Sequence, residues 1–207
     1  MLENKNEILN GYINHSGGAI GADSYWGEIG EQYGVVSNHY YYGEKTPNGN
    51  FEISEEDYEE GRNEAAKAAK YNFGYQYNKI KNTLLIRNWA QVKYSEAIFA
   101  IGHLVKTGER LFPSQKNDTR LAEHTAVQGG TGYAVAMAIL HNKPVYVFDQ
   151  ERKRWFKCVN DKWSVSDVPV LTKDFAGIGT RNLNEAGKHA IYEVYKTTAE
   201  KQEMLAK

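Results

Sequence analysis

Apolar and polar positions along the chain follow two periods, one typical of strands and one typical of helices. The unbroken apolar run at 97–101 indicates a strand buried on both faces of a parallel sheet, and 144–148 has the same character. The shorter segments 12–15 and 35–41 also favour strands, and 155–164 favours a hairpin that turns at Asn160-Asp161. The segments with helical spacing, capping residues or alanine-rich sequence are 26–33, 54–70, 80–94, 132–140 and 184–196.

Three glycine-rich turns, at 16–23, 129–132 and 177–181, each follow strand-like sequence or lead into a predicted helix. Repeated strand–turn–helix units predict an α/β fold, namely a three-layer Rossmann-like arrangement of a mostly parallel sheet with helices on both faces. We expect residues 1–207 to form a single domain. The polar, irregular segment 102–128 is expected to be an inserted loop at the ligand edge, acting as a lid or in specificity.

The turns are expected to meet in one ligand crevice, because the carboxyl ends of parallel strands share one edge of the sheet. Glycine lets the backbone approach a ligand closely, and the N–H groups at a helix start favour a phosphate. Thr180 and Arg181 add a hydroxyl and a guanidinium suited to phosphate. One such turn alone would be structural more often than not. Because neither a GxGxxG fingerprint nor a P-loop is present, a dinucleotide redox enzyme and an NTPase are disfavoured.

Several of these segments resemble one known group of proteins. The segment 16–23, SGGAIGAD, resembles the SGGAxGAD turn of the SLOG superfamily, a Rossmann-like group that contains the DNA-processing protein A fold and the lonely-guy phosphoribohydrolases. Arg87-Asn88 followed by 95–101 resembles the lonely-guy stretch in which Arg-Lys precedes SDAFIAL. The segment 129–133 is similar to the PGGxGT turn, and 175–181 is similar to the AGIGSR turn of members that carry SGGAxGAD.

The resemblance implies a site for a nucleotide-derived small molecule, with Arg87 holding it. Independently of the resemblance, Asp23 is a candidate acceptor for a ribose hydroxyl. For Asp23, ordinary capping of a helix start is an equally good explanation. The residues expected to bind the ligand are Ser16, Gly17, Gly18, Gly21, Asp23, Arg87, Asn88, Gly129, Gly130, Thr131, Gly132, Tyr133, Gly179, Thr180 and Arg181.

Three departures from the family pattern bear on function. The acid of the lonely-guy motif PGGxGTxxE aligns with Ala136, and the insertion 102–128 separates a strand from its glycine turn, where the family has almost no intervening sequence. The turn at 177–181 is the last of the three turns in the chain, whereas its counterpart normally precedes the SGGAxGAD turn by one helix. The chain is therefore expected either to be circularly permuted or to exchange its C-terminal strand and helix between the subunits of a dimer.

Two classes of function follow from the resemblance. The first is a protein that senses or sequesters a nucleotide-derived signal of the ADP-ribose or cyclic-nucleotide type without turnover, as a phage-encoded sponge of host immune signalling would. The missing acid at Ala136 favours this class. The alternative is a phosphoribohydrolase or N-glycosidase acting on nucleoside monophosphates, with Glu96 or Glu123 as a replacement acid. We assign no catalytic residue.

Other side chains leave two explanations open. Tyr40, Tyr41 and Tyr42 cannot all face one core, because alternate side chains of a strand point in opposite directions. At least one is free to stack on a base, or to form a tyrosine-rich dimer surface. Lys106, Arg110 and Arg120 in the insertion either close over a diphosphate or are simply solvated charges.

Composition narrows the function classes further. With 25 Lys and Arg against 26 Asp and Glu, the net charge of −1 does not favour duplex nucleic acid or an anionic membrane. Cys158 is the only cysteine, and the histidines lack metal-ligand spacing, so we expect no disulfide, no metal and no cofactor. The residues 1–7 lack the apolar segment of a signal peptide, and the longest apolar run, 134–140, is too short to span a bilayer. We expect a cytoplasmic protein, as a homodimer or higher homo-oligomer.

Overall fold

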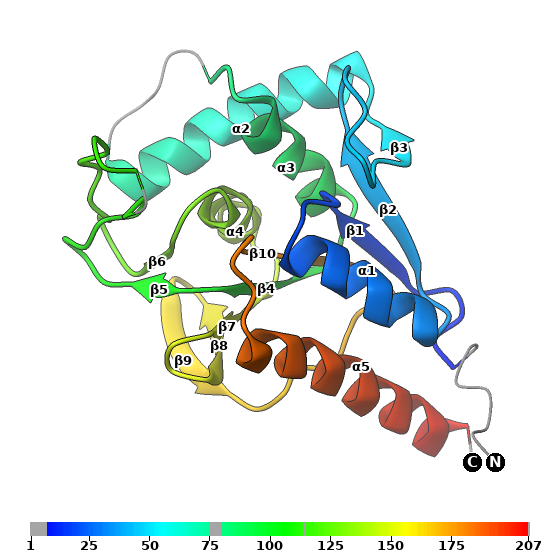
Figure 1. Cartoon of the computed structure of the whole chain (residues 1–207). Helices are drawn as coiled ribbons and strands as arrows, with labels where there is room; N and C mark the ends of the chain where they lie inside the picture. The colour runs from blue at the N-terminus through cyan, green and yellow to red at the C-terminus, as the bar shows by residue number, and fades with distance from the viewer. Residues whose placement is uncertain (1–7, 75–79, 114, 207) are drawn as a thin grey trace.

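An eight-stranded sheet organises the chain in the computed structural model, which describes residues 8–74, 80–113 and 115–206 (Figure 1). The strand order is β3-β2-β1-β10-β4-β7-β8-β9, in which β3 to β7 are parallel and the β8–β9 hairpin is antiparallel. The strands of this sheet are β1 (Ile13–Ser16), β2 (Val36–Tyr41), β3 (Phe51–Glu52), β4 (Ala97–Gly102), β7 (Val145–Asp149), β8 (Arg154–Val159), β9 (Lys162–Ser166) and β10 (Asp174–Gly179).

Strand β4 confirms the expectation of a central strand, because all six of its residues are buried. Ala97, Phe99 and Ile101 belong to one apolar core, and Ile98 and Ala100 belong to a second. Successive side chains of a strand point to opposite faces, so the two cores lie on opposite sides of the sheet.

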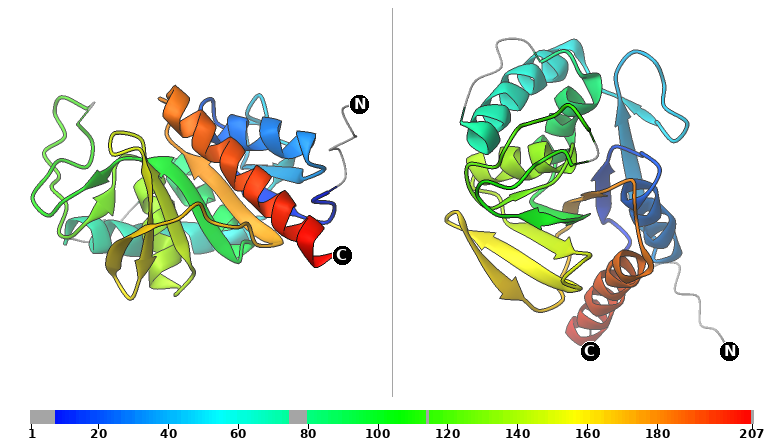
Figure 2. Two further views of the ribbon diagram at one scale, coloured as in Figure 1. Left: turned by 90° about the horizontal axis from the view of Figure 1, so that it is seen from below. Right: turned by 60° about the vertical axis from the view of Figure 1, so that its left-hand side comes forward.

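Helices cover both faces of the sheet (Figure 2). Helices α1 and α5 pack against each other on one face, whereas α2, α3 and α4 pack together on the other. The predicted α/β class with a mostly parallel sheet is confirmed. None of the described helices combines the length and apolarity needed to cross a membrane. The helices are α1 (Ala22–Gln32), α2 (Glu55–Phe73), α3 (Thr83–Lys93), α4 (Thr131–Leu140) and α5 (Glu185–Leu205).

The expected insertion begins and ends with paired backbone. Its ends form a two-stranded antiparallel sheet of β5 (Leu104–Val105) and β6 (Ala126–Val127), and Arg110 pairs with Leu121 further out. The N-terminal segment 1–7, which was expected not to be a signal peptide, lies outside the described residues.

The C-terminal strand β10 lies in the middle of the sheet of its own chain. It pairs in parallel with β1 on one side and with β4 on the other. Helix α5 continues to Leu205, beyond the predicted end near 196, because Thr198 and Ala199 still reach buried positions. Within the sheet, the glycine turns after β1 and β10 are therefore neighbours, although the 157 residues 17–173 separate the two strands in the sequence.

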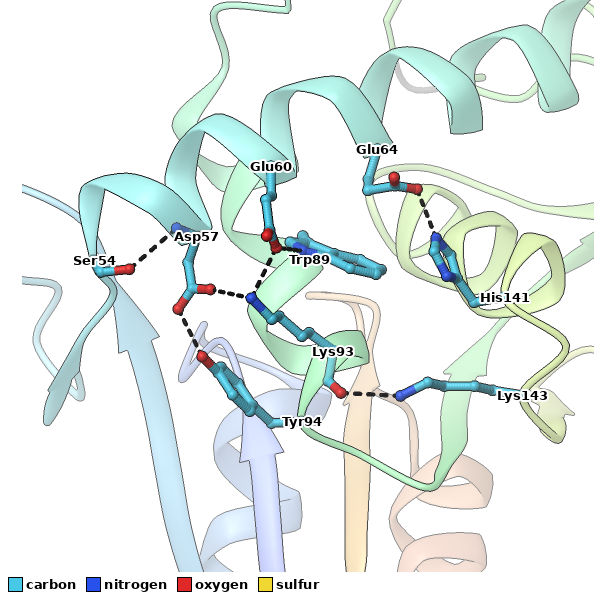
Figure 3. A network of polar contacts seen from close by, with 9 residues as sticks. All are labelled: Ser54, Asp57, Glu60, Glu64, Trp89, Lys93, Tyr94, His141 and Lys143. Carbon is cyan, nitrogen blue, oxygen red and sulfur yellow. Dashed lines mark hydrogen bonds and ion pairs between the residues drawn. The ribbon is translucent and has the colours of Figure 1, made fainter.

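A polar network fixes α3 against α2 (Figure 3). Lys93 donates to Asp57 at 2.7 Å and to Glu60 at 2.8 Å, and these bonds raise the pKa of the Lys93 ammonium. Tyr94 donates to Asp57 at 2.8 Å, and Trp89 donates to Glu60 at 2.9 Å. These contacts hold the helix that carries Arg87 and Asn88 towards the carboxyl edge of the sheet.

Candidate functional site

A cavity of about 340 Å³ opens at the carboxyl edge of the sheet, and all three glycine turns contribute to its wall. Its volume lies in the range of small-molecule sites. In addition to the three turns, helix α3 contributes residues to the wall. Eight of the predicted ligand-binding residues line it, namely Asp23, Arg87, Asn88, Gly130, Thr131, Gly179, Thr180 and Arg181.

The cavity lies where the chain leaves the sheet towards opposite faces. Helix α1 follows β1 onto one face, and α4 follows β4 and the insertion onto the other. At such a point the loops diverge and leave a crevice, which is where open α/β sheets bind their ligands.

The remaining predicted residues build the turns and do not line this cavity. The backbone of Gly21 has φ +109°, and an added Cβ would lie 2.5 Å from the carbonyl oxygen of Thr180. This position therefore needs glycine so that the first and third turns can approach each other. Tyr133 is 1% exposed and packs in the core. The other predicted residues outside the wall are Ser16, Gly17, Gly18, Gly129 and Gly132.

Arg87 is the most deeply buried cation of the site, at 4% exposure. Its guanidinium donates to the backbone oxygens of Tyr40, at 2.8 Å, and of Gly17. Its Nε is buried and has no hydrogen-bond partner among the described residues. Burial lowers the pKa of Arg87, whereas the nearby Asp23 raises it. A desolvated guanidinium with an unused donor favours the binding of an anion.

The carboxyl group of Asp23, in the cavity wall, has an unusually high pKa. Burial raises its pKa to about 6, although Arg87 and the backbone N–H groups of Gly179, Ala19 and Gly17 lower it. Its Oδ1 accepts from the N–H of Gly179 at 2.9 Å and so ties the first turn to the third. The structure thus gives Asp23 a structural role whether or not it also contacts a ligand.

The start of α4 favours an anion, and its first turn, unlike that of α1, holds no acidic residue. Helices α2, α3 and α5 begin with capping side chains, those of Ser54, Asn82 and Asn184, whereas α1 and α4 begin at Gly21 and Gly130 with no side-chain cap. Among the described residues, the N–H groups of Gly130 and Thr131 have no hydrogen-bond partner. Unpaired N–H groups and the helix dipole both favour negative charge here.

The other two turns use most of their N–H groups internally. In the first turn, Ala22 donates to the carbonyl oxygen of Thr180 at 3.0 Å, and Ser24 donates to that of Ala19 at 3.1 Å. In the third turn, the N–H of Thr180 donates to the carbonyl oxygen of Ile101 at 2.9 Å. The N–H groups of Ile20 and Gly21 in the first turn and of Arg181 in the third also have no partner among the described residues, so each turn keeps at least one unpaired donor.

Amide side chains complete the wall, and only Asn88 among them was predicted from the sequence. Gln91 follows Arg87 by one helical turn and donates to Asn88 at 3.3 Å, and Asn88 donates to the carbonyl oxygen of Gly130 at 3.1 Å. Gln128 and Asn182 also line the cavity. The helical spacing of 87, 88 and 91 was a signal that would have identified Gln91.

The structure does not bring the expected replacement acids to the cavity. Glu96 precedes β4 at the opposite, amino edge of the sheet, where its N–H donates to Asp174. Glu123 packs beside Gly74 at the end of α2. Ala136, which aligns with the acid of the lonely-guy motif, is 1% exposed and lies in the apolar core. This position therefore does not face the cavity.

The basic side chains of the insertion do not line the cavity either, so the structure does not support their closing over a diphosphate. Arg110 donates to backbone oxygens of Gln115 and Asp118, and Arg120 pairs with the Asp118 carboxylate. Lys106 is exposed. Of the described residues of the inserted segment, 102–113 and 115–128, only Gln128 reaches the cavity wall.

Comparison with models of protein families, with curated proteins and with solved structures finds no match to this chain. Among the described residues, no group of three or more His, Cys, Asp or Glu side chains is placed to hold a metal ion.

Proposed function

We propose that this protein binds a nucleotide-derived small molecule through its phosphate in the cavity and holds it without chemical turnover. One observation carries the proposal: the uncapped start of α4, the buried Arg87 and the exposed Arg181 all line the same cavity. Two guanidinium groups and unpaired backbone N–H groups converge on one space, which is the arrangement that binds phosphate in proteins.

The arrangement of the sheet supports the proposal. Parallel strands with helices on both faces agree with a Rossmann-like three-layer fold, in which ligands bind beyond the carboxyl ends of the strands. The order β1-β10-β4 also agrees with the proposed permuted relationship to the SLOG superfamily, since the turn after β10 meets the SGGAIGAD turn in space. A sensor or a sequestering protein, such as a phage-encoded sponge of a host signal, needs only this binding step.

Phosphoribohydrolase activity is the alternative, and Asp23 is the observation that favours it. Asp23 is the only carboxyl group in the wall of the cavity among the described residues, and its pKa of about 6 suits a general acid near neutral pH. Its bonds to backbone N–H groups favour a positioning role, since they hold the carboxylate in the turn.

The first experiment analyses what the purified protein releases when it is denatured. Mass spectrometry of the supernatant is combined with thermal shifts of the native protein with AMP, ADP-ribose, cyclic ADP-ribose isomers and cyclic dinucleotides. We expect an intact nucleotide, or a shift of several degrees with a compound that is recovered unchanged. Recovery of free base and ribose phosphate would instead identify a hydrolase.

Arg181→Ala tests the position of the site without disturbing a buried group. We expect it to weaken binding of the compound that gives the largest thermal shift by about tenfold, because one charge-assisted hydrogen bond to phosphate is lost. Lys201→Ala, which removes the same charge from an exposed position near the end of α5, is the matched control and should bind normally. Equal affinities of the two variants would place the phosphate elsewhere.

A further inference from the structure

A second pocket of about 450 Å³ adjoins the cavity, and Leu84 and Arg87 line both spaces. Its wall comes from the end of β2, the loop that follows β2 and the start of α3. We call it the tyrosine pocket, and the residues of its wall that matter here are Tyr41, Tyr42, Thr46, Pro47, Leu84 and Arg87. Leu84 and Arg87 therefore lie between the cavity and this pocket.

The three consecutive tyrosines at the end of β2 have different environments. Tyr40 is buried, hydrogen-bonds to His15 at 2.7 Å and stacks on its ring. Tyr42 stacks on Tyr58 with ring centroids 3.8 Å apart. Tyr41 is half-buried in the pocket wall, and its ring has no aromatic partner within the described part of the chain. Tyr41 is thus the tyrosine whose ring is not used in packing against another ring.

Two buried polar atoms belong to side chains of the pocket wall and lack partners among the described residues. They are Nε of Arg87, on a side chain that is 96% buried, and the hydroxyl oxygen of Thr46. A buried donor or acceptor without a partner costs free energy, which a ligand with its own acceptor and donor atoms recovers.

We infer that the tyrosine pocket holds the base of a nucleotide whose phosphate lies in the cavity, with Arg87 between the two groups. A nucleobase has a flat π face for the ring of Tyr41 and edge atoms for Arg87 and Thr46. The inference rests on the proposed function and narrows it, because it selects nucleotides over sugar phosphates and free phosphate.

The test compares probes that differ only in the base. Calorimetric affinities are measured for AMP, GMP, CMP and UMP and for ribose 5-phosphate, which carries the same sugar and phosphate without a base. We expect at least one nucleotide to bind more tightly than ribose 5-phosphate. Tyr41→Ala should weaken the tightest nucleotide by about tenfold, as expected for one lost base–ring stack, and leave ribose 5-phosphate unchanged.

Tyr41→Phe is the matched variant, because it keeps the stacking ring and should keep the affinity of the tightest nucleotide. If no nucleotide binds more tightly than ribose 5-phosphate, or if Tyr41→Ala leaves the nucleotide affinity intact, the base site is wrong. The phosphate site would still stand if ribose 5-phosphate binding depends on Arg181. Failure of all five probes to bind would overturn the phosphate site, and the base site with it.

Discussion

Asp23 couples the proposed site to pH. Because its pKa is raised to about 6, its carboxyl group is mainly neutral below that pH and mainly ionised above it. The charge of ADP-ribose stays constant between pH 5.5 and 8, so this probe isolates the titration of the protein. We expect its affinity to fall as the pH rises above 6, at most about tenfold per pH unit, because the ionised carboxylate repels the diphosphate.

Asp23→Asn is the control for this prediction, since its amide oxygen can still accept from Gly179. Its affinity for ADP-ribose should change little between pH 5.5 and 8 when measured by calorimetry. A pH profile that is equally steep in both proteins would show that another group is responsible.

The same titration affects stability with a defined sign. The pKa of Asp23 is higher in the folded protein than its usual value of 3.8, so the folded state binds this proton more tightly. Relative to Asp23→Asn, the natural protein should therefore lose free energy of unfolding as the pH rises from about 4 to about 6, by roughly 2–3 kcal/mol. Urea unfolding at several pH values measures this difference.

At the scale of elements, the start of α4 combines an incomplete cap with a proposed phosphate site. Gly130→Asp places a carboxylate beside the unpaired N–H groups, and the nearest atom to the new Cβ, in Leu85, would be 3.6 Å away, which is an ordinary contact. We expect the free energy of unfolding to rise by about 0.5–1 kcal/mol.

The same substitution should abolish phosphate binding, because the new carboxylate occupies and repels the anion position. Gly130→Ala is the uncharged control and should bind AMP as the natural protein does. Urea unfolding and calorimetry measure the two effects. Unchanged AMP binding by Gly130→Asp would separate α4 from the phosphate site.

The network between α2 and α3 positions Arg87 from the far end of its helix. Lys93→Met removes the cation that joins Asp57 and Glu60, and it leaves the partly buried Asp57 carboxylate without that ion pair. We expect a loss of about 1–2 kcal/mol in unfolding by urea and weaker AMP binding. Lys67→Met breaks the single pair of an exposed lysine with Glu64 and should cost about 0.5 kcal/mol or less. Equal costs would show that the network does not hold α3.

For the whole molecule, the position of β10 predicts a tolerated change of chain order. Helix α5 packs against α1, with Tyr195 stacked on Tyr33 and bonded to the carbonyl oxygen of Trp26. The N–H of Leu9 is bonded to Tyr33, so the beginning of the described chain lies near the same part of α5. A permuted chain opened between Asp167 and Val168, both exposed, with its original ends joined by a flexible linker, should fold.

This permuted chain should have the oligomeric state of the natural chain, unfold cooperatively and bind AMP with the affinity of the natural order. Size-exclusion chromatography with light scattering and calorimetry provide the readouts. If the permuted chain binds AMP only as a dimer, the third turn would have to come from a second subunit.

Local sequence patterns were enough to predict most elements. The apolar run of β4, the capping Ser54 of α2 and the turn at Asn160-Asp161, where both residues have positive φ, depend on interactions within a few residues. Longer-range features were less accessible. The end of α5 was placed too early, because its last turns are helical through contacts with distant parts of the chain.

The sequence by itself determined the α/β class, the three glycine turns and the residue types suited to phosphate, since these follow from periodicity and local backbone requirements. Only the tertiary structure decided how these parts combine. It inserted β10 between β1 and β4, used some of the N–H groups of the first and third turns internally, and directed Gln91 but neither Glu96 nor Glu123 to the cavity. Strand pairing and desolvation depend on residues far apart in the sequence, so no local pattern specifies which donors remain free for a ligand.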